Sequence, residues 1–239
     1  SNANDIYTYG KNDSTFQIVS YEVKPNLTNI VYRYNNKELK IESPLLGDFN
    51  VYNLAAAILV AINYGVSFSD IEKRIKDVSI SGRMEMINTN SNYYVMVDYA
   101  HTPNGIESLL KFVHTLDINR SIVVQGVAGE RDFLKRPIMG KTLVDNASYV
   151  IFTYEDPRRE DAKDIIDMMI RDVKGKYDNY EIVLDRHDAI KRGIDLAGEK
   201  DIVLILGKGN ENYEKLKDKV IYFNDIEEAK KAIKARKKN

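Results

Sequence analysis

The pattern of apolar positions along the chain changes near residue 88. Before this point, short runs rich in β-branched and aromatic residues predict antiparallel strands. These runs are 15–21, 29–34 and 39–41. Asn35-Asn36 lies between the last two runs, where it predicts a tight turn.

Two helices are expected after these strands. The segment 53–62 has high helix propensity and is apolar nearly all round, so a helix there needs cover on every side. A second helix is expected over 69–76. Because the strand pattern is already under way where the chain starts, we interpret 1–87 as the α+β tail of a larger domain.

From residue 93 onward, expected strands and helices alternate. The expected strands span 93–98, 120–125, 148–154, 180–184 and 201–206. The expected helices between them span 105–116, 137–146, 161–173 and 187–197, and a short helix, a strand near 219–223 and a helix over 225–237 follow. This alternation predicts an α/β fold for 88–239, with a mostly parallel sheet covered by helices on both faces.

Composition excludes several classes of protein. The 35 Lys and Arg residues nearly balance 36 Asp and Glu residues, which argues against a sequence-independent nucleic-acid binder and a membrane-surface protein. The chain has no Cys, so disulfides, thiolate zinc sites and cysteine nucleophiles are excluded. No apolar run approaches the about 20 residues of a membrane-spanning helix, and nothing at the start resembles a signal peptide. Ser1-Asn2-Ala3 indicates an expression scar.

Polar and glycine-rich clusters lie at the ends of four expected strands, which is where open α/β sheets bind ligands. They span 98–103, 126–137, 155–158 and 207–213. A fifth cluster, Gly82-Arg83-Met84-Glu85, lies at the expected domain junction, where its arginine could reach a ligand held between two domains. Each cluster also has a plain structural interpretation. The first, for example, would be a strand end followed by an N-cap Thr102 and a helix that opens at Pro103.

Three of these clusters carry groups suited to ligands. In 126–137, glycines permit close backbone approach, and cations lie near a helix that Pro137 would begin, so the cluster predicts an anion site. In 155–158, acceptors stand beside a guanidinium, which suits an amino acid with both ammonium and carboxylate groups. In 207–213, glycines could bring backbone amides to a ligand while Glu211 accepts from a cation. The alternatives are an exposed basic loop, a proline turn and a glycine-rich turn.

Two other features carry no site. Gly140-Lys141-Thr142 resembles the end of a phosphate-binding P-loop, but Lys135 occupies the position of the required first glycine, so the chain contains no complete P-loop. The three histidines have no metal-ligand spacing, and His114 and His187 are expected to be ordinary helix residues.

Taken in order, six motifs resemble those of the Mur ligases, from about residue 6 to the C-terminus. They are Gly47-Asp48-Phe49-Asn50-Val51-Tyr52-Asn53, Gly82-Arg83-Met84-Glu85, Asp98-Tyr99-Ala100-His101-Thr102-Pro103, Gly129-Glu130-Arg131-Asp132 with Lys135-Arg136-Pro137, Asp156-Pro157-Arg158, and Gly207-Lys208-Gly209-Asn210-Glu211. The hexapeptide that begins at Asp98 favours the member that adds the third peptide residue to UDP-N-acetylmuramoyl-L-alanyl-D-glutamate.

The resemblance implies a three-domain, ATP-dependent enzyme of peptidoglycan precursor synthesis, located in the cytoplasm. Residues 1–87 would be the C-terminal portion of its central ATP-binding domain, and 88–239 its Rossmann-like C-terminal domain. The UDP-binding domain, the P-loop, a modified lysine and the Mg²⁺ ligands would lie upstream, so we expect this chain alone to have no ligase activity. ATP would phosphorylate the substrate carboxylate, and a diamino acid would attack the acyl phosphate.

The resemblance also implies the ligands and partners. They are ATP, Mg²⁺, a diamino acid and the UDP-N-acetylmuramoyl-dipeptide, all for the full-length enzyme; no cofactor is expected to be required for this chain to fold. We expect a monomer that neither binds nucleic acid nor inserts into a membrane.

Residue roles follow from the matched motifs. Nucleotide contacts are implied for Asn50, Asn53, Arg83, Asp98 and His101. Contacts to the incoming amino acid are implied for Arg131, Asp156, Arg158, Gly207 and Glu211. Lys135 and Arg136 would face phosphate or the UDP-linked substrate. No catalytic set is complete in this chain, and no metal ligand is expected.

Two departures from the family pattern leave the amino acid open. The diaminopimelate enzymes usually have Asn where this chain has Asp156, and His where it has Asn210. Arg158 favours diaminopimelate or a similar dicarboxylic diamino acid, whereas Asp156 leaves lysine or another analogue open. Two other hypotheses remain at this point: the C-terminal half of a ligase like cyanophycin synthetase, and a stand-alone nucleotide or amino-acid binding module.

Overall fold

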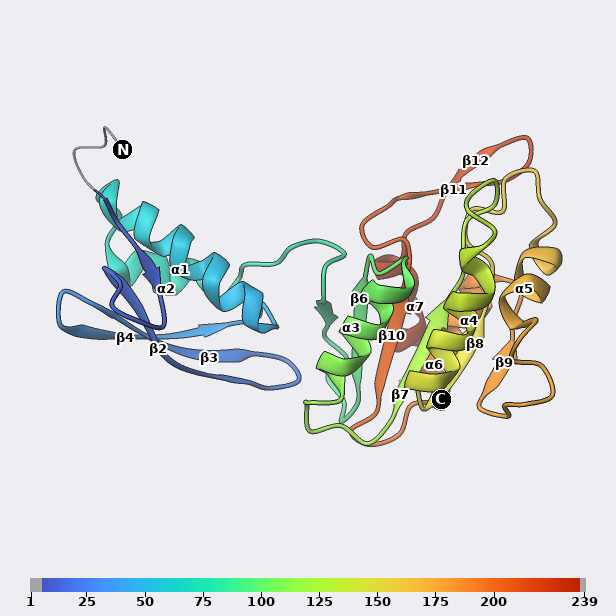
Figure 1. The fold of residues 1–239 in the computed structure, drawn as a ribbon, viewed down its shortest axis with the longest axis horizontal. Helices are drawn as coiled ribbons and strands as arrows, with labels where there is room; N and C mark the ends of the chain where they lie inside the picture. Colours follow the sequence, from blue (N-terminus) through green and yellow to red (C-terminus); the bar gives the residue numbers. More distant parts are fainter. Residues whose placement is uncertain (1–5, 237–239) are drawn as a thin grey trace. The chain divides into compact units, whose positions relative to one another are not determined.

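The computed structural model describes residues 6–236, so the expression scar expected at residues 1–3 lies outside the described residues. The chain divides into two compact units between Ile80 and Ser81 (Figure 1). This division precedes the expected boundary at residue 88. Each unit has its own sheet and its own core.

The first unit is a four-stranded sheet covered on one face by two helices. Its strands β1(Tyr9–Gly10), β2(Phe16–Val23), β3(Thr28–Tyr34) and β4(Lys37–Ser43) lie in that order, and its helices are α1(Asp48–Asn63) and α2(Phe68–Ile75). Strands β2, β3 and β4 are antiparallel, as predicted. Asn35 and Asn36 form the predicted turn with φ values of 48° and 59°.

The helices of this unit are held to its sheet by alternate apolar side chains of the strands. Phe16, Ile18 and Tyr32 pack into one core with Leu54 and Ile58 of α1. The Tyr32 hydroxyl also donates a hydrogen bond of 2.7 Å to the Val51 carbonyl. The expected burial of α1 on every side is not found within the described residues, because Val60 is 56% exposed.

The second unit contains a six-stranded sheet in the order β5-β6-β10-β7-β8-β9. The strands are β5(Glu85–Ile87), β6(Tyr94–Asp98), β7(Ser121–Gln125), β8(Tyr149–Phe152), β9(Tyr180–Ile182) and β10(Ile202–Leu206). Only β5 is antiparallel to its neighbour; the other pairs are parallel. This arrangement confirms the predicted α/β fold with a mostly parallel sheet.

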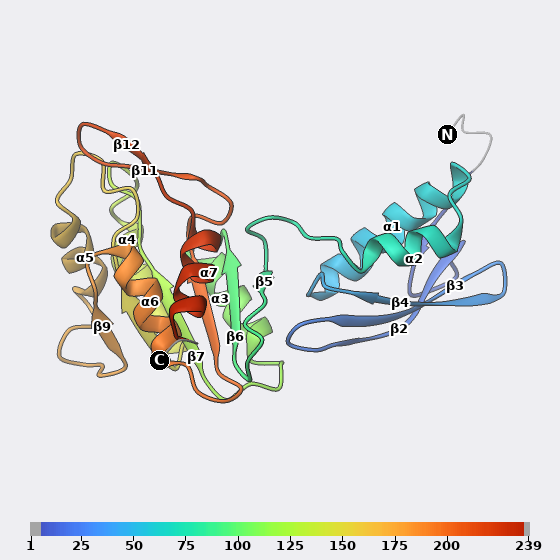
Figure 2. The same cartoon turned by 180° about the vertical axis from the view of Figure 1, so that it is seen from behind.

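Helices cover both faces of this sheet. They are α3(Pro103–Val113), α4(Lys135–Asn146), α5(Ala162–Ile170), α6(Arg186–Leu196) and α7(Asp225–Arg236). Helices α6 and α7 lie on one face and α3, α4 and α5 on the other (Figure 2). Because side chains alternate along a strand, Val203 and Ile205 pack against α6 and α7 while Leu204 faces the other layer. Both faces of β10 are therefore buried, which explains its continuous apolar run.

Three expectations about elements were wrong. The short helix expected after 206 is instead β11(Tyr213–Lys215), which forms a separate antiparallel hairpin with β12(Val220–Tyr222). The burial of its side chains alternates, with Glu214 buried and Tyr213 and Lys215 partly exposed. An alternation with a period of two residues is typical of a strand. Strand β5 was not expected, and its pairing with β6 moves the boundary to residue 80. Pro137 is the third residue of α4 and not the first.

The pairing of β5 with β6 leads to a prediction about the boundary. Ile87 is buried in the core of the second unit, and burying such a side chain contributes about 1.5–3 kcal/mol. We expect a fragment of residues 81–239 to unfold in one cooperative transition in urea, followed by circular dichroism. A fragment of residues 88–239 should be less stable by about 2 kcal/mol or more. Equal unfolding midpoints would show that β5 contributes nothing to this unit.

Candidate functional site

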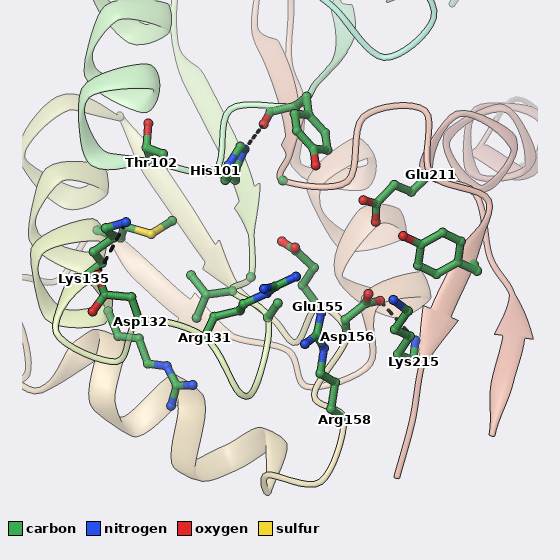
Figure 3. A pocket seen from close by; sticks show the side chains of 18 residues that line it. His101, Thr102, Arg131, Asp132, Lys135, Glu155, Asp156, Arg158, Glu211 and Lys215 are labelled. Atoms are coloured by element: carbon green, nitrogen blue, oxygen red, sulfur yellow. Dashed lines mark hydrogen bonds and ion pairs between the residues drawn. The ribbon is translucent and has the colours of Figure 1, made fainter. Parts of the chain in front are cut away.

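A pocket of about 380 Å³ opens at the carboxyl edge of the six-stranded sheet (Figure 3). Its walls come from the segments that follow β6, β7, β8 and β10, together with α4 and β11. All five residues expected to bind the amino acid line it, namely Arg131, Asp156, Arg158, Gly207 and Glu211. His101, Lys135 and Arg136 also line it. The sequence clusters at different strand ends therefore do meet in one place.

Glycines let the segments around the pocket pack backbone against backbone. A Cβ on Gly129 would lie 2.0 Å from the Pro157 carbonyl oxygen, and a Cβ on Gly82 would lie 2.1 Å from the Asn210 nitrogen. Gly129 also donates a 3.0 Å backbone hydrogen bond to the Asp156 carbonyl. The close approach that these two glycines permit is thus to neighbouring segments of the protein.

Asp98 fastens the segment before β5 to the end of β6. Its two carboxylate oxygens accept hydrogen bonds of 2.8 Å from the backbone nitrogens of Met84 and Ala100. Burial raises the pKa of Asp98, and these two bonds oppose that rise. The bond to Met84 brings Arg83 close enough to stack over the Tyr99 ring, with 4.7 Å between the guanidinium carbon and the ring centroid.

His101 lies beside this group. Its Nδ1 is 2.9 Å from the Tyr99 carbonyl oxygen, which can only accept, so Nδ1 is the donor in this contact and Nε2 is left for other partners. Three of the five expected nucleotide residues, Arg83, Asp98 and His101, are therefore neighbours in one unit.

The other two expected nucleotide residues, Asn50 and Asn53, lie in the first unit on α1. Asn50 is buried and donates to the Leu46 carbonyl at 2.7 Å, and its side-chain oxygen accepts from Asn53 at 3.2 Å. Both border an apolar groove of about 530 Å³ between α1 and α2. Asn53 is exposed, so it is the more accessible of the pair.

Asp156 is held by a lysine that the sequence analysis did not assign to the site. Lys208 is fully buried, and its Nζ lies 2.8 Å from Asp156 Oδ1 and 3.5 Å from Glu211 Oε2. Asp156 Oδ1 also accepts from the Lys215 backbone nitrogen at 3.2 Å. The negative charge of Asp156 is therefore matched inside the protein. The sequence feature that could have indicated this lysine is its place between two glycines directly after a buried strand.

Strand β11 holds the segment that carries Arg158 in an unusual conformation. Asp156 and Arg158 have positive φ values of 25° and 57°, which are unfavourable for residues other than glycine. The Arg158 backbone nitrogen donates to the Lys215 carbonyl at 3.0 Å. Figure 3 shows Asp156, Arg158 and Lys215 together on one side of the pocket. Their backbone contacts keep the Arg158 guanidinium on this wall.

The expected anion residues behave differently from one another. Arg136 is buried and pairs bidentately with Glu160, with nitrogen–oxygen distances of 2.6 and 2.8 Å. Both of its terminal nitrogens are therefore engaged by the protein. Lys135 is exposed, 3.4 Å from Asp132, and Arg131 is also exposed. The geometry leaves Arg131 and Lys135 better able than Arg136 to meet an anion.

A buried charge cluster lies beneath the pocket, and the sequence analysis missed most of it. Arg186 is fully buried and pairs with Asp225 at 2.8 and 2.7 Å, and it donates to the Leu206 carbonyl at 2.9 Å. Burial raises the pKa of Glu155 to about 7 and that of Glu214 to about 7. Arg186 follows an Asp N-cap at a helix start, a position from which burial is not evident in the sequence.

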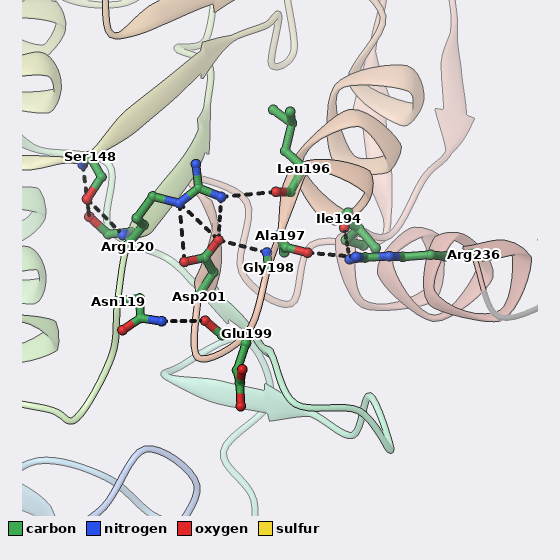
Figure 4. A network of polar contacts seen from close by, with 11 residues as sticks. Asn119, Arg120, Ser148, Ile194, Leu196, Ala197, Gly198, Glu199, Asp201 and Arg236 are labelled. Atoms are coloured by element: carbon green, nitrogen blue, oxygen red, sulfur yellow. Dashed lines mark hydrogen bonds and ion pairs between the residues drawn. The ribbon is translucent and has the colours of Figure 1, made fainter.

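A second polar network lies at the opposite edge of the sheet (Figure 4). Arg120 pairs with Asp201 at 2.5 Å, and Arg236 donates to the carbonyls of Ile194 and Ala197. These contacts join the end of α7 to the end of α6. The network is accounted for by its own internal bonds, so we assign no ligand to it.

Metal and membrane features can be stated for the described part of the chain. Within residues 6–236, no group of three or more His, Asp or Glu side chains is placed to hold a metal ion. No helix in that range has the length and apolar character needed to cross a membrane.

The raised pKa values beneath the pocket predict a pH-dependent stability. The folded protein holds a proton on Glu155 up to about pH 7, whereas the unfolded chain loses it near 4.5, so the free energy of unfolding should fall between these values. The fall should be at most about 3 kcal/mol for this carboxyl. Glu155→Gln should flatten this part of the profile, measured by urea unfolding at pH 4 to 8. Glu199→Gln, which changes an exposed carboxyl, should leave it unchanged; an unaltered profile in Glu155→Gln would contradict the assignment.

Comparisons with known proteins agree with the order of motifs along the chain. Residues 82–209 match the Mur ligase, glutamate ligase domain, and residues 1–61 match the Mur ligase middle domain. Two curated relatives are UDP-N-acetylmuramoyl-L-alanyl-D-glutamate--2,6-diaminopimelate ligases. The one from Geobacillus thermodenitrificans is 38% identical over 234 residues, and the one from Halalkalibacterium halodurans is 37% identical over 233 residues. Each alignment covers 97% of this chain and 48% of the relative, so the chain spans about half the length of these relatives.

Solved structures show the same fold. A UDP-N-acetylmuramoyl-L-alanyl-D-glutamate--2,6-diaminopimelate ligase superposes with a TM-score of 0.77 at 32% identity, covering 98% of this chain and 48% of that one. A folylpolyglutamate synthase from Thermotoga maritima superposes with a TM-score of 0.63 at 22% identity, covering 82% and 44%. The second similarity concerns the fold alone.

Proposed function

The chain belongs to the Mur ligase family, and from this premise we propose that it is part of an ATP-dependent ligase that joins a diamino acid to UDP-N-acetylmuramoyl-L-alanyl-D-glutamate. The preferred diamino acid in this proposal is diaminopimelate, which the names of the relatives specify for those proteins. The cytoplasmic location and the monomeric state implied by the resemblance remain predictions.

The observation that carries the proposal is the mixed charge of the carboxyl-edge pocket. Arg131 and Arg158 present guanidinium groups to the same cavity as the Glu211 carboxylate. A diamino dicarboxylic acid carries both kinds of charge, and guanidinium groups bind carboxylates with paired hydrogen bonds. We assign the carboxylates of the amino acid to the arginines and one of its ammonium groups to Glu211.

The chain's own residues would hold the reactants in place. Lys135 is exposed at the pocket, where it would stabilise the charge that develops as phosphate leaves an acyl phosphate. Mg²⁺ would supply further charge stabilisation in the full-length enzyme. We assign it no ligand in residues 6–236, where no group of three or more His, Asp or Glu side chains is placed to hold an ion.

Nucleotide binding is proposed for Arg83, Asp98 and His101 of the second unit and, separately, for Asn53 of the first unit. Asp98 already accepts two backbone hydrogen bonds, but a carboxylate has about four lone-pair positions, so it can also accept from a ribose hydroxyl. Asn50 is buried and its amide is used within the first unit, so we propose that it orients Asn53.

The direct test is a ligase assay on the full-length protein. ATP, Mg²⁺, UDP-N-acetylmuramoyl-L-alanyl-D-glutamate and either diaminopimelate or lysine would be supplied, and the tripeptide product identified by mass spectrometry. When diaminopimelate is supplied, we expect the tripeptide product and ADP to form together. ADP formation with no peptide product from either amino acid would contradict the proposed acceptor.

Arg158 gives a prediction about amino-acid choice. Truncating one partner of a buried, charged hydrogen bond typically costs about 2–5 kcal/mol. In the full-length enzyme, Arg158→Ala should therefore lower kcat/KM for diaminopimelate by at least about tenfold, which corresponds to about 1.4 kcal/mol. Lysine lacks the second carboxylate, so its kcat/KM should change little.

The neighbouring Arg159 is exposed and provides a matched control, because it does not line the pocket. Arg159→Ala should leave the ratio of the two kcat/KM values unchanged. If Arg158→Ala also leaves that ratio unchanged, Arg158 does not bind the distal carboxylate, and Glu211 becomes the main candidate for selection.

Arg83 gives a prediction about the nucleotide. Its guanidinium lies over the Tyr99 ring, and Arg83 is not among the residues that line the pocket. Arg83→Ala in the full-length enzyme should raise KM for ATP more than KM for the amino acid. Arg131→Ala should show the reverse preference, and a selective rise in the amino-acid KM for Arg83→Ala would refute the assignment.

A further inference from the structure

Among the buried charged groups beneath the pocket, two carboxyl groups have no cationic partner. Arg186 and Lys208 are the buried cations of this cluster, and each already has an anionic partner; the third buried cation, Arg136, is paired with Glu160. Arg186 pairs with Asp225 at 2.7 Å, and Lys208 pairs with Asp156 at 2.8 Å. Each of these two ion pairs therefore carries no net charge.

Glu155 and Glu214 are the remaining buried carboxyls of this cluster, and neither forms an ion pair within the described residues. The charged groups that act on Glu155 are Arg186 from α6, Lys208 from the segment after β10, Asp225 from α7 and its neighbour Asp156. Those that act on Glu214 are Lys208, Arg186, Asp156 and Asp185. Among the described residues, one oxygen of each of these glutamates is buried without a hydrogen-bond partner.

A buried carboxylate without a partner is costly, so such a group keeps its proton unless a positive charge arrives. Glu155 is the one of the pair that lines the pocket, and Figure 3 shows it between Arg131 and Glu211. Its position depends on Gly207, because a Cβ there would lie 2.2 Å from Glu155 Oε2. A positively charged amine in the pocket would supply the cation that Glu155 lacks.

We propose that binding of a diamino acid in this pocket is coupled to the release of a proton from Glu155, and that Glu155 thereby selects for a cationic amine. The proton passes from the carboxyl group to solvent, and the resulting carboxylate pairs with the ligand ammonium. Glu214 does not line the pocket, so the ligand is not expected to change its protonation. The inference rests on the proposed function, which assigns the pocket to an amino acid.

The test is calorimetric titration of the protein with meso-diaminopimelate at pH 7, in phosphate and in Tris, which take up protons with different enthalpies. Since the pKa of Glu155 is about 7, about half a proton should be released per ligand bound, and the measured enthalpy should differ between buffers accordingly. Glu155→Gln should remove most of that difference. Asp132→Asn should retain it, because Asp132 is an exposed carboxyl on the same pocket.

The outcomes separate the two proposals. Equal binding enthalpies in both buffers would overturn proton release while leaving the amino-acid pocket intact. An absence of binding heat would count against the pocket assignment itself. In that case the infrared spectrum of the protein at pH 7 decides the remaining point. A protonated-carboxyl band that becomes weaker in Glu155→Gln supports the held proton, with Glu214 supplying the rest of the band, and a band of unchanged intensity in Glu155→Gln overturns it.

Discussion

Contacts between backbone segments at the carboxyl edge of the parallel sheet determine where the pocket side chains lie. Gly129 packs on Pro157, Gly82 packs on Asn210, and a side-chain carboxylate of Asp98 holds the Met84 nitrogen. None of these contacts leaves room for a larger side chain or a shifted backbone. Because each segment is fixed by its neighbour, the charged side chains of the pocket start from defined positions, which lowers the entropic cost of binding a ligand there.

The charge cluster beneath the pocket is not expected to stabilise the fold. Pairing a buried arginine with an aspartate rarely adds net stability, because both ions lose their hydration. The Arg186–Asp225 pair joins the starts of α6 and α7, and its third bond, to the Leu206 carbonyl, reaches the end of β10. The Arg186–Asp225 pair thus holds the segments that carry the pocket residues. We infer that this support is the reason for keeping a buried ion pair that adds little stability to the core.

The strand ends could be predicted from the sequence because apolar runs define parallel strands, and parallel strands bring their carboxyl ends to one edge. That reasoning was sufficient to place Arg131, Arg158 and Glu211 in one pocket. It placed Lys208 at the same edge but could not reveal its burial against Asp156, since that pairing depends on side-chain packing between residues 52 positions apart. Strand β5 was missed for a similar reason: three residues become a strand only through their partner on β6.

The Lys208 pair also changes how Asp156 bears on amino-acid choice. From the sequence, the aspartate at this position left lysine or another analogue open as the amino acid. In the structure, Asp156 Oδ1 accepts from Lys208 and from the Lys215 backbone, so its charge is balanced before any ligand arrives. An ion pair adds no net charge to the wall of the pocket, just as an amide would add none. Selection between diamino acids is therefore expected to depend on Arg158, which addresses a carboxylate, and on Glu155 and Glu211, which address ammonium groups.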